Sequence, residues 1–372
     1  MFYHLFFPLT DAELLGYNLF NVFRYITFRS VMAFITGLLY SLVIGPMIIK
    51  QIKKKQALEV INEYLMDLGH REKSNTPSMG GIIFLTGVLF ASLLWNNLTN
   101  HYILLMYLVT IWLGALGFFD DYLKNIKKEK NGLIARYKFL GQIVLGLFVG
   151  MILFTSGTDH GTITQICIPF FKNVSLDILY LFIPFTILMI VGTSNGTNLT
   201  DGLDGLATGT VSIALMGLGI MSYIKGNFIN AEYLNLEFIP NAGELTVFIA
   251  ALIGSLLGFL WFNCKPAQVF MGDTGALALG GQLAVISILL REEIFFVIIG
   301  GIFVIESLSS LIQIKYFQHT RKRYGKGKWF FLMAPLHHHY QKKGYSEDKI
   351  VVRFWIISLL LLAIGLSTIK LR

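Results

Sequence analysis

Apolar segments long enough to cross a membrane recur along the whole chain. A helix needs about 20 mostly apolar residues to span the hydrocarbon core of a bilayer. Charged residues make up only 14% of the chain, against about 25% in soluble domains. The sequence therefore predicts an all-α, polytopic integral membrane protein, with residues 1–372 forming a single transmembrane domain. Ten candidate helices lie at 25–49, 79–97, 102–119, 139–156, 177–193, 205–224, 245–262, 275–290, 294–314 and 351–369.

Lysine and arginine residues predict the orientation of these helices. Most of the 30 basic residues fall after the first, third, seventh and ninth segments. Loops that carry such an excess lie in the cytoplasm. We therefore expect both termini on the opposite, external side. Cys167 and Cys264 would then lie on opposite faces of the membrane, so no structural disulfide is expected.

Acidic residues and histidines stand at the ends of the apolar segments. An ionisable side chain at membrane depth costs about 2.5–3.5 kcal/mol on insertion scales, so such residues are seldom kept there without use. The predicted topology places all of them on the cytoplasmic side. They are Asp120, Asp121, Asp201 and Asp204 in NLTDGLDG, Asp273 in FMGDTG, and His337–His339.

Each motif also has a purely structural explanation. Asp120-Asp121 could form a solvated helix end. In NLTDGLDG, Asp201 could cap a helix, but that role does not account for Asp204 one turn later. FMGDTG could be a turn that leads into a packing face of small residues. Three successive histidines point in different directions on a helix, so we do not expect His337–His339 to form a three-ligand metal site.

Carboxylates, loop glycines and lysines together indicate Mg²⁺ and phosphate. Mg²⁺ takes one or two carboxylates, and substrate phosphates complete its coordination. The sequence has no GxxxxGK[ST] motif, so ATP-driven transport has no support. The pattern predicts a metal-assisted phosphoryl transfer at the cytoplasmic membrane surface.

Several motifs, in order along the chain, resemble the phospho-N-acetylmuramoyl-pentapeptide-transferase family, a branch of the polyprenyl-phosphate N-acetylhexosamine-1-phosphate transferase superfamily. Any one motif is weak, but the set covers nearly the whole chain. One departure is Tyr340-Gln341, where the family usually continues with Phe-Glu, so no charge-dependent role is expected at position 341. The motifs are KSNTPSMGG at 73–81, DDYLK at 120–124, ARYKFLGQ at 135–142, NLTDGLDGLA at 198–207, FMGDTG at 270–275 and PLHHHY at 335–340.

The resemblance implies a reaction and a location. UDP-N-acetylmuramoyl-pentapeptide and undecaprenyl phosphate would give lipid I and UMP with Mg²⁺, in the first membrane step of peptidoglycan synthesis. It implies a multi-pass protein of the bacterial inner membrane, with its active-site cleft on the cytoplasmic face. Both substrates and membrane lipid are the expected partners, nucleic acid is not, and glycine-rich segments offer packing faces for a homodimer. One diphosphate bond replaces another, which agrees with the missing nucleotide-hydrolysis motif.

The resemblance also implies roles for individual residues. Asp273 is expected to be the principal Mg²⁺ ligand. Asp120 matches the residue proposed to deprotonate the lipid phosphate, and Asp121 would support the metal or the diphosphate. With His337 these three form the expected catalytic set. The expected substrate-binding residues are Lys73, Lys124, Lys138, Asn198, Asp201, Asp204, Asn263, Phe270, Gln313 and His338.

Alternatives stay open for the mechanism and for the function. A phosphate monoester has its second pKa at about 6, so charge neutralisation should matter more than a general base, and direct attack is favoured over a covalent aspartyl intermediate. An N-acetylglucosamine-1-phosphate transferase acting on the same lipid is the nearest alternative function. A cation or solute transporter would place ionisable residues near the centres of its spans, where only Glu306 lies.

Overall fold

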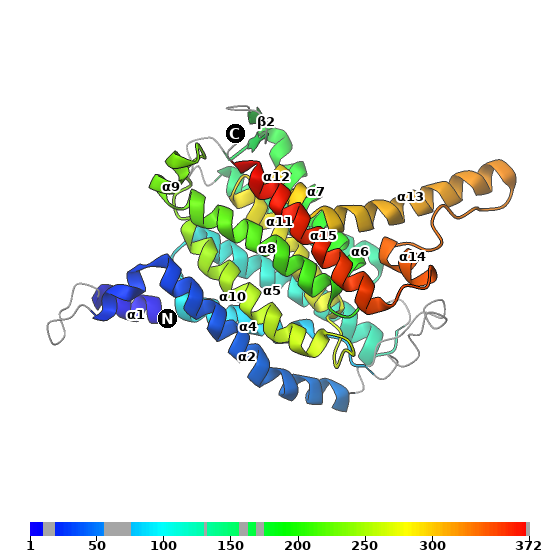
Figure 1. The fold of residues 1–372 in the computed structure, drawn as a ribbon, viewed down its shortest axis with the longest axis horizontal. Coiled ribbons are helices and arrows are strands. Elements are labelled where there is room, and N and C mark those ends of the chain that lie inside the picture. Colours follow the sequence, from blue (N-terminus) through cyan, green and yellow to red (C-terminus); the bar gives the residue numbers. More distant parts are fainter. Residues whose placement is uncertain (10–18, 56–75, 130–131, 156–162, 169–174, 370–372) are drawn as a thin grey trace.

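A computed structural model describes residues 1–9, 19–55, 76–129, 132–155, 163–168 and 175–369. Helices dominate it (Figure 1), as predicted. The predicted phosphate-binding Lys73 lies outside the described residues. The longer helices are α2 (Ile26–Lys54), α4 (Gly81–Trp95), α5 (His101–Asp121), α6 (Ala135–Thr155), α7 (Phe182–Thr200), α8 (Leu206–Lys225), α10 (Gly243–Asn263), α11 (Gly272–Leu289), α13 (Gly301–Tyr324) and α15 (Glu347–Ser367).

Shorter elements connect these helices. The N-terminal helix α1 packs near the end of α4, where Phe2 contacts Trp95, and a two-stranded antiparallel sheet precedes α7, with Ile166 opposite Leu176. Cys167 and Cys264 are both free thiols, as expected. The short elements are α1 (Phe2–Phe6), 3-10 turns at Phe7–Leu9, Leu19–Arg24 and Leu179–Leu181, a π-helical turn at Tyr122–Ile126, β1 (Gln165–Cys167), β2 (Ser175–Asp177), α9 (Phe228–Tyr233), α12 (Glu293–Ile299) and α14 (Leu336–Lys342).

Each of the ten predicted segments coincides with helix. In the described part of the chain, eight helices are long and apolar enough to span a membrane, or nine if the bent pair α12 and α13 counts as one span. The two helices of that pair meet at an angle of 77°. Helix α4 has 15 residues, about 22 Å of rise, which is less than the roughly 30 Å hydrocarbon core. The polytopic helical architecture is confirmed, eight or nine helices in the described residues qualify as candidate spans, and the count of ten stays a prediction.

The centre of the bundle consists of α8, α10 and α11. Among the candidate spans, helix α11 is the most enclosed, because 89% of its apolar 18-residue stretch is buried. Helices approach closely where one of them carries glycine: a Cβ at Gly280 of α11 would lie 2.4 Å from Cα of Ser194 on α7. In lipid, where apolar surface gives helices little reason to associate, such small-residue contacts let backbones pack tightly.

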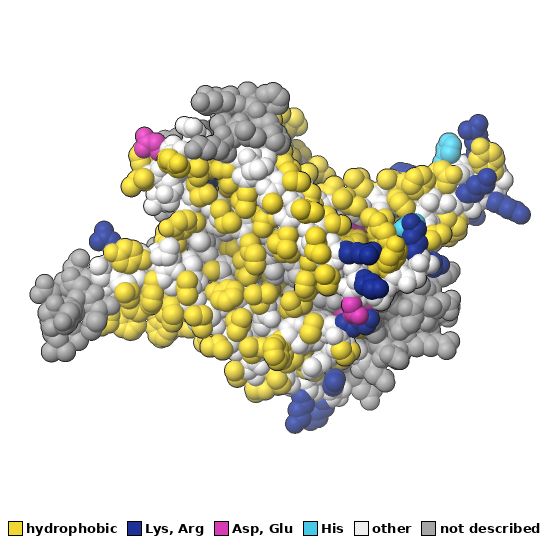
Figure 2. Space-filling view, in the orientation of Figure 1, with side chains coloured by type: hydrophobic (Ala, Val, Ile, Leu, Met, Phe, Trp, Pro, Cys, Tyr) yellow, Lys and Arg dark blue, Asp and Glu magenta, His cyan; other side chains and the backbone are white. Residues whose placement is uncertain are grey.

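Basic side chains gather at one end of the bundle. Figure 2 shows lysine and arginine at the last turns of α2, at the tip of α13 and around α14 and the start of α15. The α13 helix carries this charge away from the bundle, since it extends well beyond its neighbours (Figure 1). This is the end at which α5, α7 and α10 finish and α8 and α11 begin.

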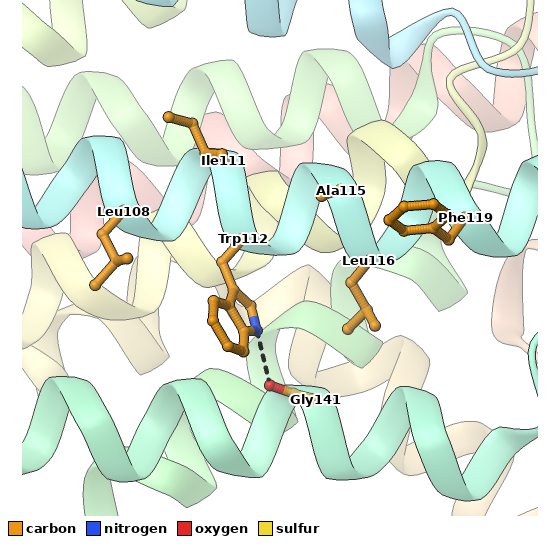
Figure 3. Close-up of a pocket in the computed structure, with 7 residues that line it drawn as sticks. All are labelled: Leu108, Ile111, Trp112, Ala115, Leu116, Phe119 and Gly141. Carbon is orange, nitrogen blue, oxygen red and sulfur yellow. Dashed lines mark hydrogen bonds between the residues drawn. The ribbon is translucent and has the colours of Figure 1, made fainter.

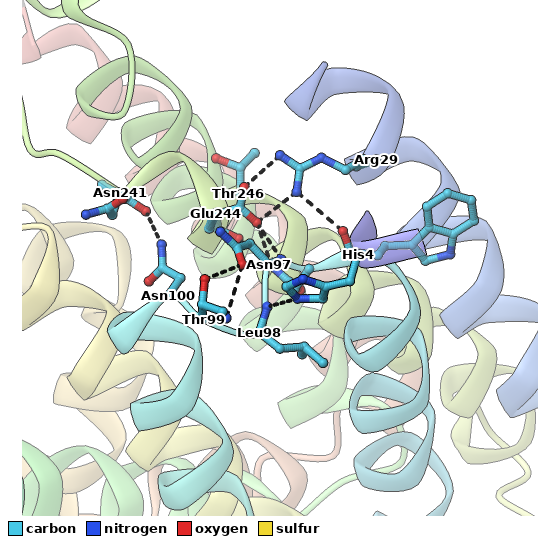
Figure 4. A network of polar contacts seen from close by, with 12 residues as sticks. His4, Arg29, Asn97, Leu98, Thr99, Asn100, Asn241, Glu244 and Thr246 are labelled. Atoms are coloured by element: carbon cyan, nitrogen blue, oxygen red, sulfur yellow. Dashed lines mark hydrogen bonds and ion pairs between the residues drawn. The ribbon is translucent and has the colours of Figure 1, made fainter. Parts of the chain in front are cut away.

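A buried ion pair holds together the opposite end of the bundle (Figure 4). Arg29 in α2 donates two hydrogen bonds to the Glu244 carboxylate in α10, at 2.6 and 2.8 Å. Glu244 also accepts the backbone N–H of Asn97 at 3.0 Å, and His4 Nε2 accepts that of Leu98 at 2.9 Å. The network joins the N-terminal residues, α2, α10 and the turn between α4 and α5.

The Glu244→Gln variant should be less stable, because the Arg29 guanidinium would stay buried without its countercharge. Removing one partner of a buried pair costs about 3–5 kcal/mol, and we expect a loss near the lower value since glutamine keeps some hydrogen bonds. The midpoint of thermal unfolding in detergent would measure this. Glu232→Gln, at an exposed position of α9, is the matched control, and equal midpoints for the two variants would contradict the prediction.

Candidate active site

Two aspartates from distant parts of the chain share two lysine ammonium groups. Lys124 Nζ lies 2.8 Å from Asp120 Oδ2 and 3.0 Å from Asp273 Oδ2. Lys138 Nζ lies 3.2 Å and 2.6 Å from the same two oxygens. We call these four residues the Asp–Lys cluster. Its formal charges cancel, which is required where helix ends bury carboxylates.

Local backbone geometry builds the Asp–Lys cluster. Lys124 follows Asp120 by four residues, which places both side chains on one helix face. The chain then returns over Asp120, whose Oδ1 accepts the N–H of Leu133 at 2.8 Å. Gly132 makes this return possible, because its φ is +53° and a Cβ there would lie 2.5 Å from Asp120 Oδ1. Lys138 then enters from the first turns of α6.

Asp121 points into the protein and holds the start of α11. Its carboxylate accepts the N–H groups of Asp273 at 3.2 Å and Thr274 at 2.9 Å, and the Thr274 hydroxyl at 2.6 Å. Free N–H groups at the start of a helix favour a carboxylate partner. Through these hydrogen bonds, Asp121 orients Asp273. Its expected role in supporting the metal or the diphosphate stays a prediction.

Asp204 and Asn263 fix the loop that leads to Asp273. Asn263 Oδ1 accepts the Thr208 hydroxyl at 2.9 Å, and its Nδ2 donates to the Val269 carbonyl at 3.0 Å. Asp204 Oδ2 accepts the N–H of Ala267 at 3.1 Å. Both predicted substrate-binding residues are buried. They thus connect the start of α8 to residues 264–271, the loop that directly precedes Gly272 and Asp273.

The remaining predicted residues lie around this loop and beside α14. Phe270 is half-buried, and its N–H and C=O pair with Pro77 and Gly80. Asn198 and Asp201, at the end of α7, are half-buried as well.

Gln313 and His338 both make local contacts. Gln313 Oε1 accepts the N–H groups of Phe330 and Phe331 at 3.2 and 2.9 Å. His338 Nδ1 lies 2.7 Å from Oε1 of Gln341. The departure from the family pattern at position 341 therefore keeps a hydrogen bond to His338 without the negative charge.

Among the residues that the sequence did not identify as site residues, Thr274, Glu347 and Glu306 each contact a predicted one through a side chain. Thr274 binds Asp121, Glu347 accepts the N–H of Asp204 at 3.0 Å, and Glu306 pairs with His337 at 3.2 Å. The position of Glu306 inside an apolar segment was a usable signal, because intramembrane ionisable residues usually have a functional partner. Glu347 gave no comparable signal.

The Asp–Lys cluster has ligands that fit Mg²⁺. In the residues that the structure describes, no group of three or more His, Cys, Asp and Glu side chains could hold a metal. Mg²⁺ needs no such protein cage, since one or two carboxylates and substrate phosphates suffice. Asp120 and Asp273 are two carboxylates directed at the same pair of ammonium groups. They fit a metal that enters together with a phosphorylated substrate.

An apolar groove runs between α5 and α6 (Figure 3). It encloses about 400 Å³ and is bridged by Trp112 Nε1, which donates to the Gly141 carbonyl at 3.0 Å. No charged residue lines it, so it does not suit an anionic nucleotide. Its lining residues are Leu108, Ile111, Trp112, Ala115, Leu116, Phe119 and Gly141.

The chain is similar to known proteins. Residues 103–291 match the model of glycosyl transferase family 4, and residues 73–85 match phospho-N-acetylmuramoyl-pentapeptide-transferase signature 1. Proteins named phospho-N-acetylmuramoyl-pentapeptide-transferase are similar along their whole length. One from Citrifermentans bemidjiense is 44% identical with all of both chains covered, and one from Chloroherpeton thalassium is 46% identical with 95% of each covered. One from Flavobacterium psychrophilum is 44% identical, with 95% of this chain and 96% of the relative covered.

Gly117→Ala should destabilise the contact between α5 and α11 that positions Asp273. A Cβ at Gly117 would lie 2.2 Å from the backbone oxygen of Asp273, so one helix must move. Gly192→Ala on α7 is the matched control, since a Cβ there has nothing within 4 Å and alanine favours helix by about 1 kcal/mol. We expect a lower thermal midpoint in detergent for Gly117→Ala and an unchanged or higher one for the control. Equal midpoints for Gly117→Ala and Gly192→Ala would show that the contact between α5 and α11 is loose.

Proposed function

The chain belongs to the phospho-N-acetylmuramoyl-pentapeptide-transferase family, and we propose that it transfers phospho-N-acetylmuramoyl-pentapeptide from UDP-N-acetylmuramoyl-pentapeptide to undecaprenyl phosphate, giving lipid I and UMP. Relatives with that name match it at 44–46% identity over 95–100% of its length. The observation that carries the proposal for the chemistry is the Asp–Lys cluster at one end of a membrane bundle.

The two ammonium groups are suited to bind phosphate. Lys124 and Lys138 are held by carboxylates in this structure, and an incoming diphosphate would compete with those carboxylates for them. Asp120 and Asp273 would then be free to hold Mg²⁺. When bound, Mg²⁺ supplies charge neutralisation on the diphosphate. Lys124, whose side chain is 37% exposed, is the more accessible ammonium group, and Lys138 is 15% exposed.

The reaction exchanges one diphosphate bond for another. An oxygen of the lipid phosphate forms a bond to the β-phosphorus of the nucleotide, and the bond from that phosphorus to the bridging oxygen breaks, so that UMP leaves. The attacking phosphate is largely ionised at neutral pH. The main tasks of the protein are therefore to orient the two phosphates and to offset their charge. Direct attack is preferred because Asp120, Asp121 and Asp273 are all engaged by donors rather than activated as nucleophiles.

The turn that carries Asp201 would face the nucleotide, with Asn198 and Phe270 beside it. The basic side chains at this end of the bundle (Figure 2) support a cytoplasmic site and external termini, in the inner membrane of a bacterium. A homodimer stays a prediction.

Purified protein should release UMP from UDP-N-acetylmuramoyl-pentapeptide when undecaprenyl phosphate and Mg²⁺ are present. With Asp273→Asn, we expect a lower rate and a higher Mg²⁺ concentration for half-maximal rate, by about ten- to a hundredfold, because a carboxylate ligand would be lost. Coupled detection of UMP over a Mg²⁺ titration measures both. Lipid product from UDP-N-acetylglucosamine alone would instead identify an N-acetylglucosamine-1-phosphate transferase, and ion flux without UMP release would favour a transporter.

Lys138→Met should reduce kcat by about a hundredfold or more, since a group that stabilises charge in the transition state is typically worth that much. Methionine keeps the length of the side chain and removes the ammonium group. The matched control is Lys127→Met in the loop after α5, where the lysine is exposed. UMP release at saturating concentrations of both substrates gives the comparison. Equal rates for the two variants would remove Lys138 from the site.

A further inference from the structure

Glu306 is a fully buried carboxylate in the second turn of α13. Its Oε2 accepts the N–H of Leu336 at 2.7 Å, and its Oε1 accepts the N–H of His337 at 3.2 Å. A buried carboxylate is tolerated only when such donors surround it. Glu306 therefore ties α13 to the start of α14, a segment 30 residues further along the chain.

The same carboxylate lies beside the imidazole of His337. Glu306 Oε2 lies 3.2 Å from His337 Nδ1, and both side chains are 0% exposed. Within the described residues, both ring nitrogens are buried and neither has a hydrogen-bond partner. The place of the ring therefore depends on the backbone N–H that His337 donates to Glu306 and on close packing, with Nδ1 on the side of Glu306.

The Nε2 edge of the ring packs against the turn that carries Asp201. A Cβ built on Gly202 would lie 2.2 Å from His337 Nε2 and 2.8 Å from Cε1. The turn is held from other directions through Asp204, whose Oδ2 accepts the N–H of Ala267 and whose N–H donates to Glu347. The imidazole thus packs directly against the backbone of this turn.

We propose that Glu306 and His337 are positioning residues, which set the place of the Asp201–Gly202 turn without touching substrate themselves. This proposal rests on the proposed function in one respect: the turn is taken to face the nucleotide. It changes the role expected for His337. A fully buried imidazole that packs against the backbone of the Asp201–Gly202 turn acts by holding that backbone in place. It also gives Glu306, the ionisable residue within an apolar segment, a task other than ion conduction.

A double-mutant cycle tests the proposal. Glu306→Gln and His337→Ala should each lower kcat/KM for UDP-N-acetylmuramoyl-pentapeptide by about ten- to a hundredfold, as loss of a partner that orients a histidine does elsewhere. The effect should fall on KM for the nucleotide substrate and leave KM for undecaprenyl phosphate unchanged. Because the two residues act through one contact, the double variant should lose less than the product of the two single losses.

Further variants separate positioning from general stability. His337→Asn keeps a planar polar side chain beside Glu306 and should restore part of the activity that His337→Ala loses. Gly202→Ala changes the other side of the contact between the turn and the imidazole. It should likewise raise KM for the nucleotide substrate. Glu244→Gln is the matched control, since it breaks a buried carboxylate contact at the opposite end of the bundle and should lower the thermal midpoint without changing either KM.

The outcomes are distinct. Independent losses in Glu306→Gln and His337→Ala, or a fall in thermal midpoint with both KM values unchanged, would overturn the positioning role. Wild-type protein that releases no UMP would overturn the proposed function instead. In that case, binding of UDP to the wild type and to Glu306→Gln, measured by calorimetry, still tests whether the turn forms part of a nucleotide site. Equal affinities there would contradict the proposal.

Discussion

The shared pairing of two lysines with two aspartates holds the site end of this membrane protein together. Each of these charges alone would be costly to bury, and each is compensated by a residue from another helix. Asp120 closes α5, Lys138 opens α6 and Asp273 opens α11, so the pairing also joins three helices. The proposed phosphate binding and the helix packing would therefore depend on the same ammonium groups. A substrate that binds them would have to replace their structural contribution as well.

A second layer of contacts keeps Asp273 where the Asp–Lys cluster needs it. Asp121 binds the first N–H groups of α11, and Asn263 binds the loop that approaches it. Asp121 and Thr274 stand next to Asp120 and Asp273 in the same two motifs, yet they bind each other and not the lysines. In these two motifs, one polar residue joins the Asp–Lys cluster and its neighbour holds the helices together.

Sequence reasoning located the helices well because lipid imposes a strong length and polarity requirement on them. It also grouped Asp120, Lys124 and Asp273, since a shared chemistry needs them together. It could not show that α4 is short, that the chain bends between α12 and α13, or that Asp121 faces α11. Those features depend on tertiary packing. The pairing of Glu306 with His337 was hidden for the same reason, although the placement of Glu306 was an available clue.

Helix α10 is tied at both of its ends, by Glu244 to Arg29 and by Asn263 to the loop before Phe270. Nineteen steps of helix separate the two anchors, a rise of about 29 Å, close to the roughly 30 Å of a typical hydrocarbon core. The helix therefore sets a fixed distance between these two anchors. In a thinner or thicker membrane it cannot shorten, so tilt or deformation of the surrounding lipid must absorb the mismatch.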